Sequence, residues 1–168
     1  MRLTALTCAL ALLLGLPAVA SAAAAPSARA FVAWIYGHYP IPETSHFEPM
    51  GRSAPQVWDA GMVALLKEDS RLAGGEVGFI DADEFCQCQD DGGMKSRIAD
   101  VQSTGPASAV AHVTLSYPGE AGGAPQTVTL YLVLVKGQWR VHDLGNHDNP
   151  SLRADLIKAN AEARRGHH

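Results

Sequence analysis

The chain has 168 residues, of which 13 are basic and 17 acidic, so its formal net charge is −4 at pH 7. This mild acidic excess argues against nucleic acid or an anionic membrane surface as the partner, because both attract basic proteins. It suits a soluble protein, or one that meets a basic partner.

Residues 1–22 have the features of a secretory signal peptide. Arg2 supplies a positive charge, an apolar run extends from Leu3 to Val19, and Ala20-Ser21-Ala22 forms a small-residue cleavage site. The run is too short and too rich in alanine to favour a membrane span. We therefore expect export to the periplasm, with a single mature domain over residues 23–168 and no membrane span in it.

Two helices are expected at the start of the mature chain. Ser27 can cap the first, which carries an apolar stripe and ends before Pro40. A proline-rich loop follows over residues 40–54. Ser53 can cap the second helix, which tolerates a proline in its first turn and runs to Gly74.

After this point the pattern predicts strands. The segment 109–117 alternates between apolar and polar residues, which is typical of a half-buried strand. The segment 127–135 is apolar on both faces near its end, which predicts a central strand covered on both sides. Lys136-Gly137 predicts a tight hairpin turn after it. The expected strands are residues 77–80, 98–103, 109–117, 127–135 and 138–144.

A last helix is expected from about Asn149, with Arg164 and Arg165 near its end in agreement with the helix dipole. Two helices, a run of mainly antiparallel strands and a terminal helix indicate the α+β class.

Four short strings of the chain are similar, in their order, to a family of exported bacterial domains of unknown function with a Cys-Gln-Asp motif. The similarity spans residues 31–156. The strings are Phe31-Val-x-Trp34-Ile-Tyr36-x-x-Tyr39, Asp81-x-Asp83 with Cys88-Gln89-Asp90, Gly137-x-Trp139-Arg-Val-x-Asp143, and Ser151-Leu-Arg-x-x-Leu156.

This resemblance implies a small periplasmic or lipoprotein domain of the nuclear transport factor 2-like superfamily. In that fold, two N-terminal helices pack on a strongly curved, mainly antiparallel sheet shaped like a cone. Some proteins of this kind lie beside antibacterial effectors and act as immunity proteins, although a fold alone does not determine a function.

Cys86 and Cys88 are the only cysteines after the expected cleavage site. In an exported chain they form a disulfide or remain as half-buried thiols. A metal site would need two further ligands, and no zinc-like spacing supplies them. Reactive thiols need electropositive neighbours, whereas carboxylates surround this pair. We therefore expect a structural role, and a thiol-linked redox protein is the third hypothesis.

The same region is strongly acidic. Its spacing matches no calcium-binding loop, so we expect no metal and no other cofactor. An acidic turn in solvent is the simplest interpretation. The alternative is a landing surface for a basic protein, with two aromatic anchors. That surface would comprise Phe79, Asp81, Asp83, Glu84, Phe85, Asp90 and Asp91.

Asp143 is the candidate for chemistry. In a cone-like fold its strand could direct the carboxylate into a cavity lined by Trp139 and Tyr131, where it would act as a general base or as a polar anchor for a small ligand. No second acid or tyrosine partner is evident from the spacing. The other interpretation is that Asp143 holds a backbone turn or pairs with Arg140 or Arg153.

The leading hypothesis is therefore a non-enzymatic periplasmic binding protein, an immunity or inhibitor protein that neutralises a secreted toxin. The alternative is a small-ligand carrier or proton-transfer enzyme that uses Asp143.

Overall fold

The computed structural model describes residues 27–42, 44–90, 92–118 and 124–166. The expected signal peptide, the start of the mature domain up to residue 26, and Asp91 of the expected landing surface lie outside them. The elements in chain order are α1 (Ala28–Tyr36), α2 (Ala54–Val57), α3 (Ala60–Ala73), β1 (Lys95–Gly105), β2 (Ser108–Ser116), β3 (Gln126–Val135), β4 (Gln138–Gly145) and α4 (Leu152–Gly166).

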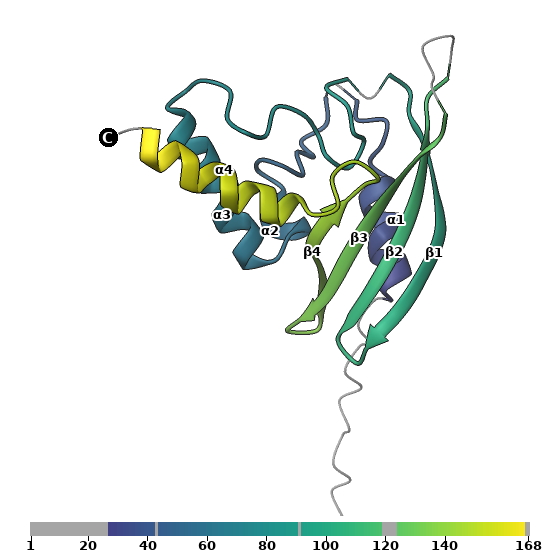
Figure 1. Cartoon of the computed structure of the whole chain (residues 1–168). Coiled ribbons are helices and arrows are strands. Elements are labelled where there is room, and N and C mark those ends of the chain that lie inside the picture. Colours follow the sequence, from purple (N-terminus) through teal and green to yellow (C-terminus); the bar gives the residue numbers. More distant parts are fainter. Residues whose placement is uncertain (1–26, 43, 91, 119–123, 167–168) are drawn as a thin grey trace, which may run out of the picture.

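The four strands form one antiparallel sheet in the order β1-β2-β3-β4 (Figure 1). The α+β class and the terminal helix are thus confirmed. The sheet is open, with β1 and β4 as its edges. The strong, cone-like curvature that the resemblance implies stays a prediction.

The β3–β4 hairpin forms where the sequence predicts it. Lys136 and Gly137 have φ angles of 51° and 76°, which is the left-handed backbone of a two-residue turn that matches strand twist. The strand expected at 77–80 is wrong, because this segment is a loop in the structure. Its backbone N–H groups bind a side chain of α3, as described below, and the first strand begins only at Lys95.

The core lies on one face of the sheet. The inward residues of β2 and β3 are buried, and they belong to one cluster with apolar side chains of α1, α3 and α4. On the other face, Tyr131 and Val135 are 39% and 43% exposed. The expectation that this strand is covered on both sides is therefore wrong. The apolar residues of its second face are β-branched or aromatic types that also suit a half-exposed strand.

The helix expected to start at Ser53 is interrupted. After α2 the chain becomes extended at Trp58, which forms a parallel bridge with Val141 of β4, and the Asp59 N–H donates to the Val141 carbonyl at 3.0 Å. The chain then restarts as α3, where Asp59 Oδ1 accepts the Met62 N–H at 2.8 Å. Ser53 makes no capping hydrogen bond, so the expected cap belongs to Asp59.

Helix α1 begins as expected, whereas α4 begins at Leu152, three residues after the expected start near Asn149. Ser27 Oγ accepts the Ala30 N–H of α1 at 3.1 Å, and Ser151 Oγ accepts the Ala154 N–H of α4 at 3.1 Å. Helices α3 and α4 pack side by side, where Asn160 donates to the Leu65 carbonyl at 3.0 Å. Among the described helices, none combines the length and the hydropathy needed to cross a membrane.

Candidate functional site

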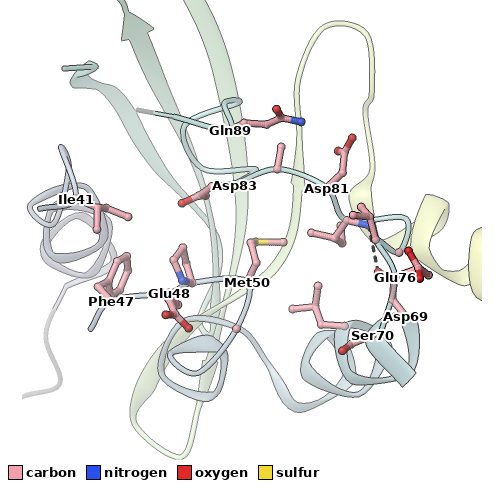
Figure 2. A pocket seen from close by; sticks show the side chains of 17 residues that line it. Ile41, Phe47, Glu48, Met50, Asp69, Ser70, Glu76, Asp81, Asp83 and Gln89 are labelled. Atoms are coloured by element: carbon pink, nitrogen blue, oxygen red, sulfur yellow. Dashed lines mark hydrogen bonds between the residues drawn. The ribbon is translucent and has the colours of Figure 1, made fainter. Parts of the chain in front are cut away.

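An open groove of about 850 Å³ lies between the segments 41–51 and 76–89, with α3 beside it (Figure 2). Apolar and acidic side chains share its lining, and no lysine, arginine or histidine is among the described residues that line it. The apolar lining residues are Ile41, Phe47, Pro49, Met50, Leu66, Val77, Ile80 and Ala82. The acidic ones are Glu48, Asp69, Glu76, Asp81 and Asp83.

One wall of the groove is held in place by Asp69. This buried carboxylate of α3 accepts the N–H groups of Phe79 at 2.9 Å and Ile80 at 3.1 Å. A Cβ atom at Gly78 would lie 2.5 Å from Asp69 Oδ2, so only glycine permits this approach. The segment 76–81 is therefore fixed on α3 as a loop.

The opposite wall is tied to the core by the Trp58 indole, which donates to the Pro49 carbonyl at 2.8 Å. The Glu48 N–H donates to Ser53 Oγ at 3.0 Å, and Phe47 is buried and stacked on the His38 ring. Both walls are thus preorganised before any partner binds, which lowers the entropic cost of binding.

The groove carboxylates differ in what they already bind. A hydrogen bond from Arg52 holds the pKa of exposed Glu48 below its ordinary value. Asp83 accepts the Tyr39 hydroxyl at 2.5 Å and the Phe85 N–H at 2.9 Å. Glu76 and Asp81 are exposed and form no ion pair with another described residue. Their charges are the ones that the groove offers to solvent.

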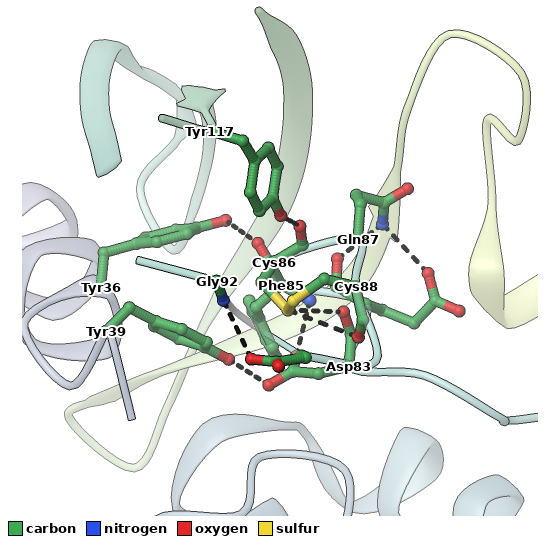
Figure 3. Close-up of a disulfide and its surroundings, with 11 residues drawn as sticks. Tyr36, Tyr39, Asp83, Phe85, Cys86, Gln87, Cys88, Gly92 and Tyr117 are labelled. Carbon is green, nitrogen blue, oxygen red and sulfur yellow. Dashed lines mark hydrogen bonds between the residues drawn. A yellow bond between two sulfur atoms is a disulfide. The ribbon is translucent and has the colours of Figure 1, made fainter. Parts of the chain in front are cut away.

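The acidic segment continues into a tight loop closed by the Cys86–Cys88 disulfide (Figure 3). Asp83 and Cys88 exchange backbone hydrogen bonds of 2.9 and 3.3 Å. The hydroxyl of Tyr36 donates to the Phe85 carbonyl at 3.2 Å, and that of Tyr117 donates to the Cys86 carbonyl. The loop is therefore pinned to α1 and to the residue after β2.

This pinning changes the expected landing surface. Phe85 is fully buried against Tyr36 and Trp58, so it cannot be a surface anchor, which corrects the expectation. The physical reason is that the disulfide loop directs Phe85 inward. Phe79 is 43% exposed, as an anchor requires.

The acidic members of that surface are also divided. Asp81 and Asp83 line the groove, while exposed Asp90 accepts the Gly92 N–H at 3.0 Å. Glu84 is partly buried, and burial together with neighbouring acids such as Asp83 raises the pKa of its carboxyl. A hydrogen bond from Gln87 opposes this rise.

The disulfide forms part of a smaller hollow of about 440 Å³, which it shares with Tyr39, Asp83 and Asp90. The charged side chains among its described lining residues are all carboxylates. Such surroundings disfavour a thiolate, and Cys86 is buried. The geometry is that of a structural link within a loop.

Asp143 does not share a face of the sheet with Trp139, as the expected cavity requires. His142 is an extra residue in β4, a bulge that puts Asp143 opposite Tyr131 and leaves Trp139 opposite Leu134. Neighbouring positions on a strand point to opposite faces, and Tyr131 alternates with inward Leu130 and Leu132. Tyr131 and Trp139 therefore lie on opposite faces, and the structure does not bring the three expected cavity residues together.

The carboxylate of Asp143 is engaged at the start of α4. It accepts the N–H groups of Leu144 at 2.8 Å and Arg153 at 2.9 Å, and the Ser151 hydroxyl at 2.6 Å. This is the backbone-turn role that the sequence left open as the alternative, and Arg153 takes part through its main chain.

Asp59 forms a cluster of polar contacts that the sequence analysis did not predict. Its carboxylate lies 2.6 Å from His142 Nδ1 and 2.7 Å from Arg153 Nη2, besides accepting the Met62 N–H. Burial acts to raise the pKa of Asp59, but these hydrogen bonds together outweigh it and hold the pKa below its ordinary value. The cluster joins α3, β4 and α4 and is structural.

Asp69, Glu76 and Met50 of the groove were also missed. The burial of Asp69 could have been predicted from the sequence, because Asp69 lies on the same helical stripe as the buried residues Met62, Leu66 and Leu72. A buried aspartate on such a stripe needs donors, and a nearby loop backbone can supply them. No sequence pattern of this kind predicts that Glu76 and Met50 line the groove.

Within the described part of the chain, no group of three or more His, Cys, Asp or Glu side chains has an arrangement that could hold a metal ion. No protein-family model matches the chain, and the searches of curated proteins and of solved structures returned no match.

Proposed function

We propose that the chain is a non-enzymatic binding protein that neutralises a basic secreted toxin by direct contact, in the manner of an immunity protein. The observation that supports this is the groove, which combines apolar lining residues with charged ones that, in the described part, are all acidic. Buried apolar contacts supply affinity and complementary charges supply specificity and a fast association rate.

The use of the candidate chemical groups points the same way. The carboxylate of Asp143 accepts hydrogen bonds from Ser151 and Arg153 at the start of α4, and Cys86 and Cys88 form a disulfide in an acidic loop. A general base needs a free lone pair within reach of a substrate proton, and a redox thiol needs a stabilised thiolate. Neither requirement is favoured by these contacts.

We place this activity in the periplasm on the basis of residues 1–22, and we propose that the open sheet and α1 belong to a nuclear transport factor 2-like cone. Both parts of the proposal come from the residue strings and the apolar leader. An N-terminal sequence determination on protein from the periplasmic fraction tests the first part, and a mature protein that begins at Met1 would refute it.

A crosslinking experiment tests binding through the groove. A photoreactive amino acid replaces Val77, which is 76% exposed on the groove, and a matched variant carries it at exposed Gln102 of β1. We expect a basic protein to be captured from position 77 only. The capture should disappear when Asp81→Lys reverses a groove charge.

The captured protein is then purified and mixed with the native chain. We expect co-elution as one complex at micromolar concentration, and relief of the captured protein's toxicity in cells that express both. Separate elution, or a capture that Asp81→Lys leaves unchanged, would contradict the proposal.

A further inference from the structure

The groove offers side chains to a partner, but it offers no strand edge. Its described lining residues come from α3 and from the segments 41–51 and 76–89, and none belongs to β1, β2, β3 or β4. An extended peptide that docks by strand addition gains its affinity from main-chain hydrogen bonds to a sheet edge. That template is missing from the described walls of this groove.

A partner that docks here finds no strand edge for its backbone groups, so a segment whose backbone groups are already paired within its own structure suits the groove best. A helix is such a segment, because each interior N–H is already paired within the helix. Helix-in-groove recognition uses only one apolar face of the partner, which packs against apolar side chains. Met50 points from one wall into the groove (Figure 2), and Ile80 lines the other wall.

The charges are placed to match one flank of such a helix. Glu76 and Asp81, which form no ion pair with another described residue, stand on one wall, whereas Glu48 on the other wall is already paired with Arg52 (Figure 2). A helix whose apolar face enters the groove would direct the residues of one flank toward Glu76 and Asp81. Lysine or arginine on that flank would meet these carboxylates, whereas an anionic flank would be repelled.

We propose that the groove receives a basic amphipathic helix of the protein partner, with its apolar face on Met50 and Ile80 and its lysine or arginine residues beside Glu76 and Asp81. This inference rests on the proposed function, in which the partner is a basic protein. It adds the secondary structure and the residue pattern of the segment that is recognised.

The test uses a synthetic probe of about four helical turns, with leucine on one face and lysine on the other. A second peptide of the same composition has a scrambled order that destroys the amphipathic face. A third carries glutamate in place of lysine. The native chain is labelled with ¹³C at its methionine methyl groups, because Met50 lines the groove while Met62 and Met94 are buried in the core.

We expect the leucine–lysine peptide to shift the Met50 methyl resonance in a saturable way and to leave those of Met62 and Met94 in place. Asp81→Lys should weaken binding by at least about tenfold, since it replaces an attraction by a repulsion. Asp100→Lys, the same charge change in β1, should weaken it by less than about twofold. The scrambled and glutamate peptides should bind at least about tenfold more weakly.

An unmoved Met50 resonance at saturating peptide, or equal binding of the scrambled peptide, would overturn the helix inference. Mass spectrometry of the protein captured at Val77 separates this failure from failure of the proposed function. A captured segment without amphipathic helical pattern, with capture still dependent on Asp81, removes the helix and keeps the binding function. If no protein is captured at Val77 in a way that depends on Asp81, both the helix inference and the proposed binding function are refuted.

Discussion

Replacing Asp143 by alanine distinguishes the two roles that were open for this residue. Its carboxylate accepts three hydrogen bonds, from the Leu144 and Arg153 N–H groups and from the Ser151 hydroxyl. Loss of a helix-capping side chain costs about 1 kcal/mol. The other two donors lose their acceptor in a partly buried setting, at about 0.5–1 kcal/mol each.

We therefore expect Asp143→Ala to lower the free energy of unfolding by about 2–3 kcal/mol. In a chain of this size that corresponds to a fall in Tm of about 5–10 °C. Urea unfolding followed by far-ultraviolet circular dichroism measures it, and the m-value should stay constant because the surface exposed on unfolding is unchanged.

Two further variants make the test specific. Asp148→Ala alters an exposed aspartate of the neighbouring loop and should change the free energy of unfolding by less than about 0.5 kcal/mol. Ser151→Ala combined with Asp143→Ala should cost less than the sum of the two, because both changes remove the same hydrogen bond. A stability equal to that of Asp148→Ala would refute the capping role and return Asp143 to the alternative of a proton-handling residue.

Three other substitutions test the structure by unfolding measurements. Gly145→Ala should cost about 1–3 kcal/mol, since its Cβ would lie 2.3 Å from the Pro150 carbonyl oxygen, whereas Gly166→Ala, with open space around it, should be neutral. Asp59→Asn should remove a contribution to the free energy of unfolding that depends on pH. Because the pKa of Asp59 is held below its ordinary 3.8, this contribution is present above about pH 4 and is lost as the pH falls through the folded-state pKa. The difference between native and variant stability should therefore shrink toward low pH, and a constant difference would contradict this. Glu84→Gln should stabilise the chain at pH 7 by at most about 1 kcal/mol, because burial raises the pKa of Glu84 above its ordinary 4.5 and the ionised form is disfavoured. This gain should vanish below about pH 4, and a loss of stability at pH 7 would contradict it.

The elements that follow from local rules were read correctly from the sequence. The alternation at 109–117 became β2, with Ala109, Ala111, Val113 and Leu115 buried. The Lys136-Gly137 turn became the β3–β4 connection, and Ser27 became the cap of α1. Each of these depends on side chains within a few residues of one another, so the information is present in a short window.

The errors share a different origin. The segment 77–80 is as apolar as a strand, but Asp69 of α3 captures its backbone. The helix expected from Ser53 is interrupted at Trp58 because that residue pairs with Val141 of β4. In each case a partner distant in the sequence overrides the local preference for a strand or a helix, and no pattern within the segment itself predicts this contact.

The amino-acid sequence alone therefore determined the class of fold, the strand periods, the turns and the acidic character of the chain, because these follow from composition and short-range spacing. Tertiary structure decided which acidic and apolar side chains share a surface. Phe85 turned into the core, a single extra residue at His142 reversed the face of Asp143, and three separate segments met to form the groove. The physical reason is that a groove is made by contacts between distant segments, and the packing of a core selects those contacts only once the whole chain is folded.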